Sequence, residues 1–148
     1  MYADNNGDRF PLGDAGFYPG GMQWWFALQP YITQLQPSMA RAGVFVCPAS
    51  RNTSGSADYG INAFLGSGWA VPYSYRMVVR SSETVLAGDR IGYNWHLNVP
   101  ALDAWGYPAD GYPAYRHPNR ANVVLVDGHV EAMNASQLDQ LSSFAYWF

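Results

Sequence analysis

The sequence predicts one α+β domain, in which a helical N-terminal stretch packs on an antiparallel β-sheet. The chain has 148 residues, close to the commonest size of a single domain, and shows neither an internal repeat nor a linker, so 1–148 is treated as one unit. Apolar residues in 22–36 follow a helical spacing. Asp127-Gly128 stands between two β-favouring runs, which is the strongest short-range signal for a hairpin.

The N-terminal half predicts a loop, a helix, a strand and a second loop. Residues 1–22 are rich in turn formers and are expected to form a loop. The helix over 22–36 contains Pro30, which must kink it or begin a second turn. Residues 44–48 form a short β-favouring run that a proline stops, and the Ser- and Gly-rich residues 49–58 are expected to be a loop.

The middle of the chain predicts strands followed by a long insertion. Residues 59–65 and 74–79 are rich in aromatic and β-branched types, which favours strands, and 84–89 reads as a strand of the core. Residues 91–116 contain several glycines and prolines among many aromatic residues. A long irregular loop insertion is therefore expected there, and loops of that length usually carry function or are packed by their own rings.

The hairpin is the clearest local prediction. Residues 122–126 and 129–133 favour strands, and Asp127-Gly128 between them predicts a two-residue type I′ turn, which requires positive φ at both central residues. A short helix over 137–141 and an aromatic tail over 144–148 follow.

Composition excludes several classes of protein. Hydrophobic residues make up 49% and charged residues 13%, so disorder through charge is excluded. The eight basic residues are all arginines, scattered in a chain of net charge −3, and no basic stripe for nucleic acid exists. The single cysteine, Cys47, allows no intrachain disulfide and is expected to be a buried thiol without an activating base. Apolar stretches are only a few residues long, so no membrane span is predicted.

Six short motifs occur in order along the chain. They are Tyr2-Ala3-Asp4-Asn5-Asn6-Gly7 with Pro11, Trp25-Phe26-Ala27-Leu28-Gln29-Pro30-Tyr31, Phe45-Val46-Cys47-Pro48-Ala49, Tyr59-Gly60-Ile61-Asn62, Thr84-Val85-Leu86-Ala87-Gly88-Asp89, and His117 followed by nine residues and Asp127-Gly128. In this order they resemble the bacterial pilin-like proteins with a prepilin-type leader that carry a His, nine residues, Asp-Gly signature. The resemblance spans residues 1 to about 135.

The resemblance implies a pilin-like fold and a pseudopilin-type subunit of a type II secretion or type IV pilus-like filament, which works by assembly and not as an enzyme. The expected partners are copies of this chain and other pilin-like subunits in a helical filament, at the cell envelope or outside the cell. Members begin with a cleaved leader and a hydrophobic helix that provides the only membrane contact. This sequence opens at the end of that helix, and we expect that the helix was trimmed away rather than that this copy assembles without it.

The histidines and the hairpin supply a candidate metal site. His117, Asp127 and His129 offer two imidazoles and a carboxylate, a set that suits zinc or iron. However, Asp127 in the turn and His129 just after it are predicted to point in different directions. The preferred expectation is structural: Asp127 accepts hydrogen bonds from turn amides, and His117 packs on the hairpin as a hydrogen-bonded strut.

Calcium is a weaker candidate cofactor, and otherwise no cofactor is expected. Residues 4–8 begin like an EF-hand loop, but Arg9 stands where that loop requires glycine. Major pseudopilins carry calcium in a loop near the C-terminus, and by that analogy Asp103 and Asp110 in the 91–116 insertion are the candidate ligands.

Aromatic residues, 16% of the chain, exceed what one small core can hold. Rings of the insertion are predicted to contact a neighbouring subunit or to pack on their own loop. The alternative is an extracellular carbohydrate-binding module that stacks polysaccharide on the same rings. The residues concerned are Tyr93, Trp95, Trp105, Tyr107, Tyr112 and Tyr115.

Overall fold

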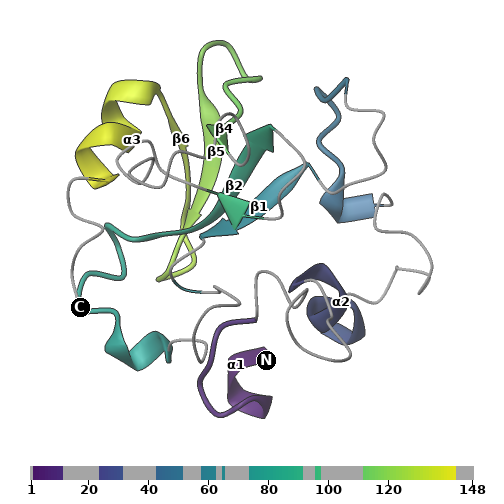
Figure 1. The fold of residues 1–148 in the computed structure, drawn as a ribbon, viewed down its shortest axis with the longest axis vertical. Coiled ribbons are helices and arrows are strands. Elements are labelled where there is room, and N and C mark those ends of the chain that lie inside the picture. The colour runs from purple at the N-terminus through teal and green to yellow at the C-terminus, as the bar shows by residue number, and fades with distance from the viewer. Residues whose placement is uncertain are drawn as a thin grey trace.

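A small β-sheet forms the centre of the fold, and helices lie against both of its faces (Figure 1). The computed structural model describes residues 2–11, 24–31, 43–51, 58–62, 65, 74–91, 96–97 and 112–142. The body of the sheet is antiparallel and consists of β1 (Tyr59–Asn62), β2 (Val85–Ile91), β5 (Ala121–Leu125) and β6 (Val130–Met133), side by side in that order. β3 (His96–Leu97) runs parallel to β1, and β4 (Tyr112–Pro113) pairs with the end of β2.

Helical elements are short. They are α1 (Tyr2–Asn5), α2 (Trp24–Leu28), α3 (Ala135–Ser142) and the 3₁₀ turns η1 (Gln29–Tyr31), η2 (Gly43–Phe45) and η3 (Tyr75–Met77). The α+β prediction is therefore confirmed. In the predicted helix 22–36 the structure describes 24–31, which is α-helical up to Leu28 and 3₁₀ across Pro30, the position where the sequence predicts a break.

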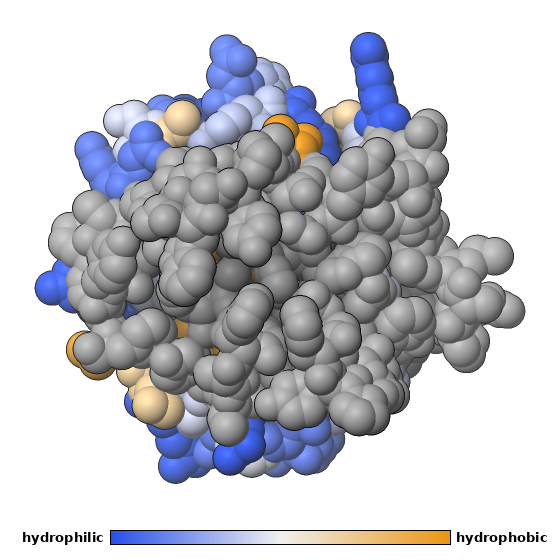
Figure 2. All heavy atoms as spheres, viewed as in Figure 1, coloured by the Kyte–Doolittle hydropathy of each residue, from blue (hydrophilic) through white to orange (hydrophobic). Residues whose placement is uncertain are grey.

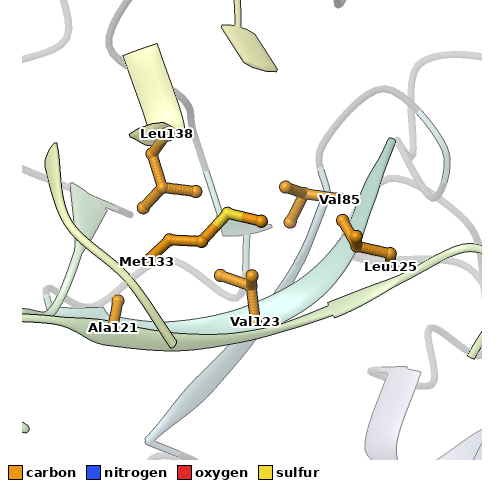
Figure 3. Close-up of a cluster of buried hydrophobic side chains, with 6 residues drawn as sticks. All are labelled: Val85, Ala121, Val123, Leu125, Met133 and Leu138. Atoms are coloured by element: carbon orange, nitrogen blue, oxygen red, sulfur yellow. The ribbon is translucent and has the colours of Figure 1, made fainter. Parts of the chain in front are cut away.

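Helix α3 covers one face of the sheet. Burial alternates along β5, as the two-residue period requires when one face of a strand lies in the core. Figure 3 shows the β5 side chains and Leu138 of α3 pointing toward one another, with Met133 between them and Val85 beside Leu125. The cluster consists of Val85, Ala121, Val123, Leu125, Met133 and Leu138. Burying each of the larger of these side chains contributes about 1.5–3 kcal/mol to stability.

Helix α2 packs on the other face through a cluster of aromatic and aliphatic residues. Trp24, Trp25, Phe45 and Ile61 are buried, and Leu28, Tyr59 and Leu86 pack against them. The Trp24 ring meets Trp25 and Phe45 edge-on, with ring centroids 5.7 and 5.5 Å apart. A register shift between Val85 and Ala87 makes Leu86 the extra residue of β2, which turns it toward this cluster. The prediction of an N-terminal helix on an antiparallel sheet is thus confirmed for the described residues.

The hairpin is confirmed, but its predicted turn type is wrong. Gly128 donates its N–H to the Leu125 carbonyl, and Leu125 donates to His129, which leaves a three-residue connection. Gly128 has a positive φ of 95°, whereas Asp127 does not have a positive φ. This arrangement is the turn followed by a left-handed glycine that forms a G1 bulge, and it needs positive φ only at the glycine.

The predicted helix 137–141 is confirmed and begins two residues earlier, because Asn134 caps it. The Gln137 N–H donates to Asn134 Oδ1 at 2.9 Å, and the Asn134 N–H donates to Gln137 Oε1 at 3.0 Å. This reciprocal pair satisfies two backbone donors that a helix start otherwise leaves without partners.

Several strand and loop predictions need correction. Strand 59–65 is confirmed for Tyr59–Asn62, whereas Leu65 is in a turn and residues 63 and 64 lie outside the described ranges; the predicted strand 84–89 is observed as Val85–Ile91. In 44–48, η2 replaces the strand, because the Cys47 N–H is taken by the Asp58 side chain rather than by a neighbouring strand. In 74–79, only Ser74 forms a bridge, to Arg9, and its hydroxyl then caps η3.

The remaining predictions lie partly within the described residues. In the predicted loop 1–22, residues 2–5 form α1. The turn that follows this helix contains two residues with positive φ, Gly7 and Asp8. The insertion 91–116 contains β3 and β4, and its residues 92–95 and 98–111 lie outside the described ranges, as does the tail 144–148.

Candidate functional site

Buried polar side chains from distant parts of the chain meet at one end of β1. They form what we call the buried polar cluster: Cys47, Asp58, Tyr59, Asp89, Arg116 and His117. Asp58 and Asp89 are 0% exposed and Cys47 is 1% exposed. Charged groups are rarely buried to this degree unless they are paired. We therefore take the cluster as the candidate site.

Asp58 joins the loop after η2 to the sheet. Its Oδ2 accepts the Cys47 N–H at 3.0 Å, and its Oδ1 accepts the Ser50 hydroxyl at 2.6 Å. The Asp58 backbone carbonyl accepts the Arg90 N–H at 3.0 Å, which extends the pairing of β1 with β2 by one residue. A carboxylate is needed here because a neutral acceptor would hold these donors less strongly.

Arg116 lies between the two buried carboxylates. Its Nη1 is 3.8 Å from Asp58 Oδ1 and 3.8 Å from Asp89 Oδ1, and its side chain is largely buried. The guanidinium also donates to the backbone carbonyls of Asp58 and Arg90. One cation thus faces two anions, which leaves the three side chains with a net negative charge.

The turn that precedes β5 sets the position of His117. The Arg120 N–H donates to the His117 carbonyl, and the His117 N–H donates to the Arg120 carbonyl at 3.1 Å. Pro118 is the second residue of this turn, and Asn119, with φ 61°, is the third. A proline followed by an asparagine in the left-handed region matches a type II turn, so local sequence fixes where His117 leaves the backbone.

His117 brings together Cys47 and Asp89. Its Nε2 is 3.4 Å from Cys47 Sγ and 3.3 Å from Asp89 Oδ2. Asp89 Oδ2 also accepts the Asn122 N–H at 2.8 Å, whereas the buried Oδ1 has no hydrogen-bond partner among the described residues. Cys47, Asp89 and His117 are the set of potential metal ligands that the described part of the chain brings together.

Tyr59 closes the cluster beside Cys47. The pKa of its hydroxyl is raised to about 12. Burial is the largest cause, and the neighbouring Cys47, Asp89 and Asp58 side chains make smaller contributions in the same direction. A phenolate would be partly desolvated and would lie beside these groups, so Tyr59 remains protonated at neutral pH.

The geometry disfavours a catalytic triad. In a triad the nucleophile and the acid occupy different nitrogens of the imidazole, whereas here both Cys47 and Asp89 face Nε2. A nucleophile must also be reachable by substrate, and Cys47 is buried. The same three groups do suit a metal ion, because thiolate, imidazole and carboxylate are its usual protein ligands.

The predicted set of His117, Asp127 and His129 does not come together. His117 stands before β5, and Asp127 and His129 follow its other end. Asp127 and His129 do not point apart as predicted: Asp127 Oδ1 lies 2.7 Å from His129 Nδ1 and accepts the His129 N–H at 3.2 Å. Asp127 thus binds a turn amide, as expected. His117, however, contacts Asp89 and Cys47 instead of the hairpin, and Cys47 has the neighbouring base that the sequence did not predict.

Most residues predicted to contact sugar, a subunit or calcium lie outside the described ranges: Tyr93, Trp95, Trp105, Tyr107, Asp103 and Asp110. Of the others, Tyr112 contributes its backbone to β4. Tyr115 is half-buried against the α3 side of the sheet, and burial, with a smaller effect of Asp139, raises its pKa. The carbohydrate interpretation stays a prediction.

Asp58 and Arg116 are the members of the cluster that sequence reasoning missed. Asp58 ends a Ser- and Gly-rich stretch and Arg116 ends the aromatic insertion, so both look like ordinary surface residues. The available signal was their adjacency to motif residues, since Asp58 directly precedes Tyr59 and Arg116 directly precedes His117.

None of the helices within the described ranges has the length and apolar character that crossing a membrane requires. Comparison with known proteins yields no matching family model, no matching curated protein and no matching solved structure.

Proposed function

We propose that this domain is pilin-like and forms the water-facing head of a pseudopilin-type subunit, whose function is to assemble into a filament at the cell envelope. The observation that carries the proposal is that the six sequence motifs of the resemblance contact one another in the folded chain. The motifs were identified from residue order alone, so their meeting in space is independent support for one shared architecture.

The contacts run from motif to motif. Asn5 and Asn6 of the first approach the Tyr31 hydroxyl of the second, at 3.4 Å each. Apart from Trp24, the members of the α2 cluster come from the second to the fifth motifs: Trp25, Leu28, Phe45, Tyr59, Ile61 and Leu86. The sixth motif joins through His117 in the buried polar cluster, and its hairpin end joins through the Val126 N–H, which donates to Thr84 of the fifth.

An exposed apolar patch beside the N-terminal segment supports subunit contact. Tyr75, Met77 and Val79 are exposed, Met77 by 54% and Val79 by 84%. The segment is attached to the N-terminal residues, because Tyr75 donates its N–H to the Asp8 carbonyl and Arg76 Nε lies 2.6 Å from Asp8 Oδ2 (Figure 1). In Figure 2 the described residues that reach the surface are mainly hydrophilic, with a few apolar groups among them. Because Met77 and Val79 are apolar and strongly exposed, their segment is a candidate contact surface. A second copy of the chain, brought close by the hydrophobic helix that the resemblance implies, would cover these side chains.

The test is to produce the protein from its complete reading frame together with a prepilin peptidase, and to examine sheared cell-surface material by sedimentation and electron microscopy. We expect fibres that contain this chain. A Met77→Asp, Val79→Asp double variant should reduce fibre yield, because it places charge in the subunit contact.

Ile91→Asp is the matched control, since Ile91 is 51% exposed but lies at the far end of β2 from this patch. It should leave fibre yield unchanged. A protein that is processed, folded and still entirely dispersed would rule out the filament function, and equal loss in both variants would rule out the patch.

A further inference from the structure

We propose that Cys47, Asp89 and His117 bind a zinc ion. This site lies outside the proposed assembly function and does not depend on it. One atom from each of the three residues lies within 4.8 Å of the others, and the three come from η2's trailing loop, from β2 and from the turn before β5. The zinc would therefore tie three separate parts of the chain together.

Two of the three separations between the ligand atoms match those of a tetrahedral metal site. With Zn–S of about 2.3 Å and Zn–N or Zn–O of about 2.0–2.2 Å, tetrahedral angles place neighbouring ligand atoms about 3.3–3.6 Å apart. Cys47 Sγ lies 3.4 Å from His117 Nε2, and Nε2 lies 3.3 Å from Asp89 Oδ2. The third pair, Cys47 Sγ and the Asp89 carboxylate, lies within 4.8 Å, and an ion bound among the three atoms would hold this pair at the same tetrahedral separation.

Hydrogen bonds alone explain these contacts less well. Nε2 of a neutral imidazole offers either one proton or one lone pair, yet a thiol and a carboxylate both face it. A charge-assisted N–H to carboxylate bond is about 2.7–2.9 Å long, which is shorter than the separation of 3.3 Å here. A metal ion removes the conflict, because it takes the imidazole lone pair, the thiolate and the carboxylate together.

The charges and the surrounding groups also suit a divalent cation. A thiolate and the Asp89 carboxylate would neutralise Zn²⁺, and Arg116, which is 3.8 Å from both carboxylates, would then balance the charge of Asp58. The buried Asp89 Oδ1 lacks a hydrogen-bond partner among the described residues and faces Arg116 at 3.8 Å, which keeps the carboxylate charged. The Asn122 N–H and Tyr59 would hold Asp89 and Cys47 from outside, as outer groups do in metal sites. Water would occupy the fourth coordination position of the zinc. It can reach the site beside His117, whose side chain is 31% exposed.

Cobalt provides a direct probe, because Co²⁺ replaces Zn²⁺ and reports its ligands by absorption. The protein is dialysed against chelator and titrated with Co²⁺, and then with Zn²⁺. We expect one equivalent of Co²⁺ to produce the visible bands of a tetrahedral site and a thiolate-to-cobalt band in the near ultraviolet, and Zn²⁺ to abolish both. Because Cys47 is the only cysteine, the thiolate band can arise from no other residue.

Cys47→Ser should lose the thiolate band and weaken Co²⁺ binding by about 100-fold or more, since loss of an outer group alone weakens metal sites by about 10–100-fold. The control is His129→Ala, which removes the exposed pair of Asp127 and His129 and should leave the spectrum unchanged. Should Cys47→Ser fail to fold, the unaltered protein decides the matter: one equivalent of Zn²⁺ should slow modification of Cys47 by a thiol reagent by about tenfold or more. A titration without a thiolate band, binding that disappears with His129, or thiol reactivity indifferent to Zn²⁺ would each overturn the site.

Discussion

Replacement of Asp58 by alanine should destabilise the protein more than any other single polar substitution in the buried polar cluster outside the proposed zinc ligands. Asp58 is fully buried and accepts hydrogen bonds from the Cys47 N–H and the Ser50 hydroxyl, and Arg116 faces it. Hydrogen bonds to a charged group each contribute about 1.5–3 kcal/mol, and breaking a buried ion pair costs about 3–5 kcal/mol. These contributions overlap, so the expected loss is about 3–5 kcal/mol in the free energy of unfolding.

A loss of that size is measurable, because domains unfold with only about 5–15 kcal/mol. Urea unfolding can be followed by tryptophan fluorescence, which the buried Trp24 and Trp25 should make sensitive to the packing of the nearby sheet. Chelator in all samples keeps any bound metal from contributing.

Asp58→Asn is the matched variant. It keeps the shape and one oxygen acceptor but loses the charge, so it should cost about 1–2 kcal/mol. If Asp58→Ala unfolds within about 0.5 kcal/mol of the unaltered protein, which is the usual range for surface substitutions, Asp58 does not hold the cluster together. If Asp58→Asn is as unstable as Asp58→Ala, the charge of the carboxylate, and not the hydrogen bond that an amide oxygen can still accept, holds the cluster together.

Three further predictions concern the turn, the cap and the pH dependence. Gly128→Val should lower stability by about 1–3 kcal/mol in thermal unfolding, because φ 95° strains a β-branched residue, and Gly128→Asn should cost less; equal effects would contradict this. Asn134→Ala should cost about 1 kcal/mol in the same assay, since it removes the α3 cap, whereas Asn134→Asp should be nearly neutral. Tyr59 has a pKa raised above its unfolded value of 10.0, so its contribution to stability should be complete below pH 10 and lost as the pH rises through about 12. In the presence of chelator, the Tyr59→Phe variant should lose less stability at alkaline pH than the unaltered protein. Its ultraviolet titration should also lack one phenolate that forms at high pH. Identical titration curves for the two proteins would refute the assignment to Tyr59.

Local patterns predicted the elements whose stability is local or whose partners are adjacent in sequence. The hairpin is one case, because β5 and β6 pair with each other and the left-handed glycine between them is required by the backbone. Helix α3 is another, because its cap lies within one turn of its start. The turn type was missed because Asp-Gly serves both two-residue and three-residue connections, and only the register of the strands distinguishes them.

The failures occurred where a strand depends on a partner distant in sequence. Residues 44–48 and 74–79 have strand-forming side chains, but β-propensity mainly reflects packing on a neighbouring strand. Within the described ranges these segments form only the single bridge of Ser74 with Arg9. The buried polar cluster could not be predicted for the same reason. Cys47 and His117 are 70 residues apart, and nothing in either segment indicates that the other will lie against it.

The buried polar cluster and the exposed patch have separate physical roles. The members of the cluster are buried or half-buried, so they offer little surface for contact with a neighbouring subunit. Met77 and Val79, in contrast, are exposed and contribute little to the core. With one cysteine, the chain has no intrachain disulfide to constrain its unfolded state, and the proposed zinc site would supply a cross-link in its place. Linking residue 47 to residue 117 closes a long loop, which is where such a cross-link removes the most chain entropy. Variants of the cluster should therefore change the free energy of unfolding at unchanged assembly per folded molecule, and variants of the patch should do the reverse.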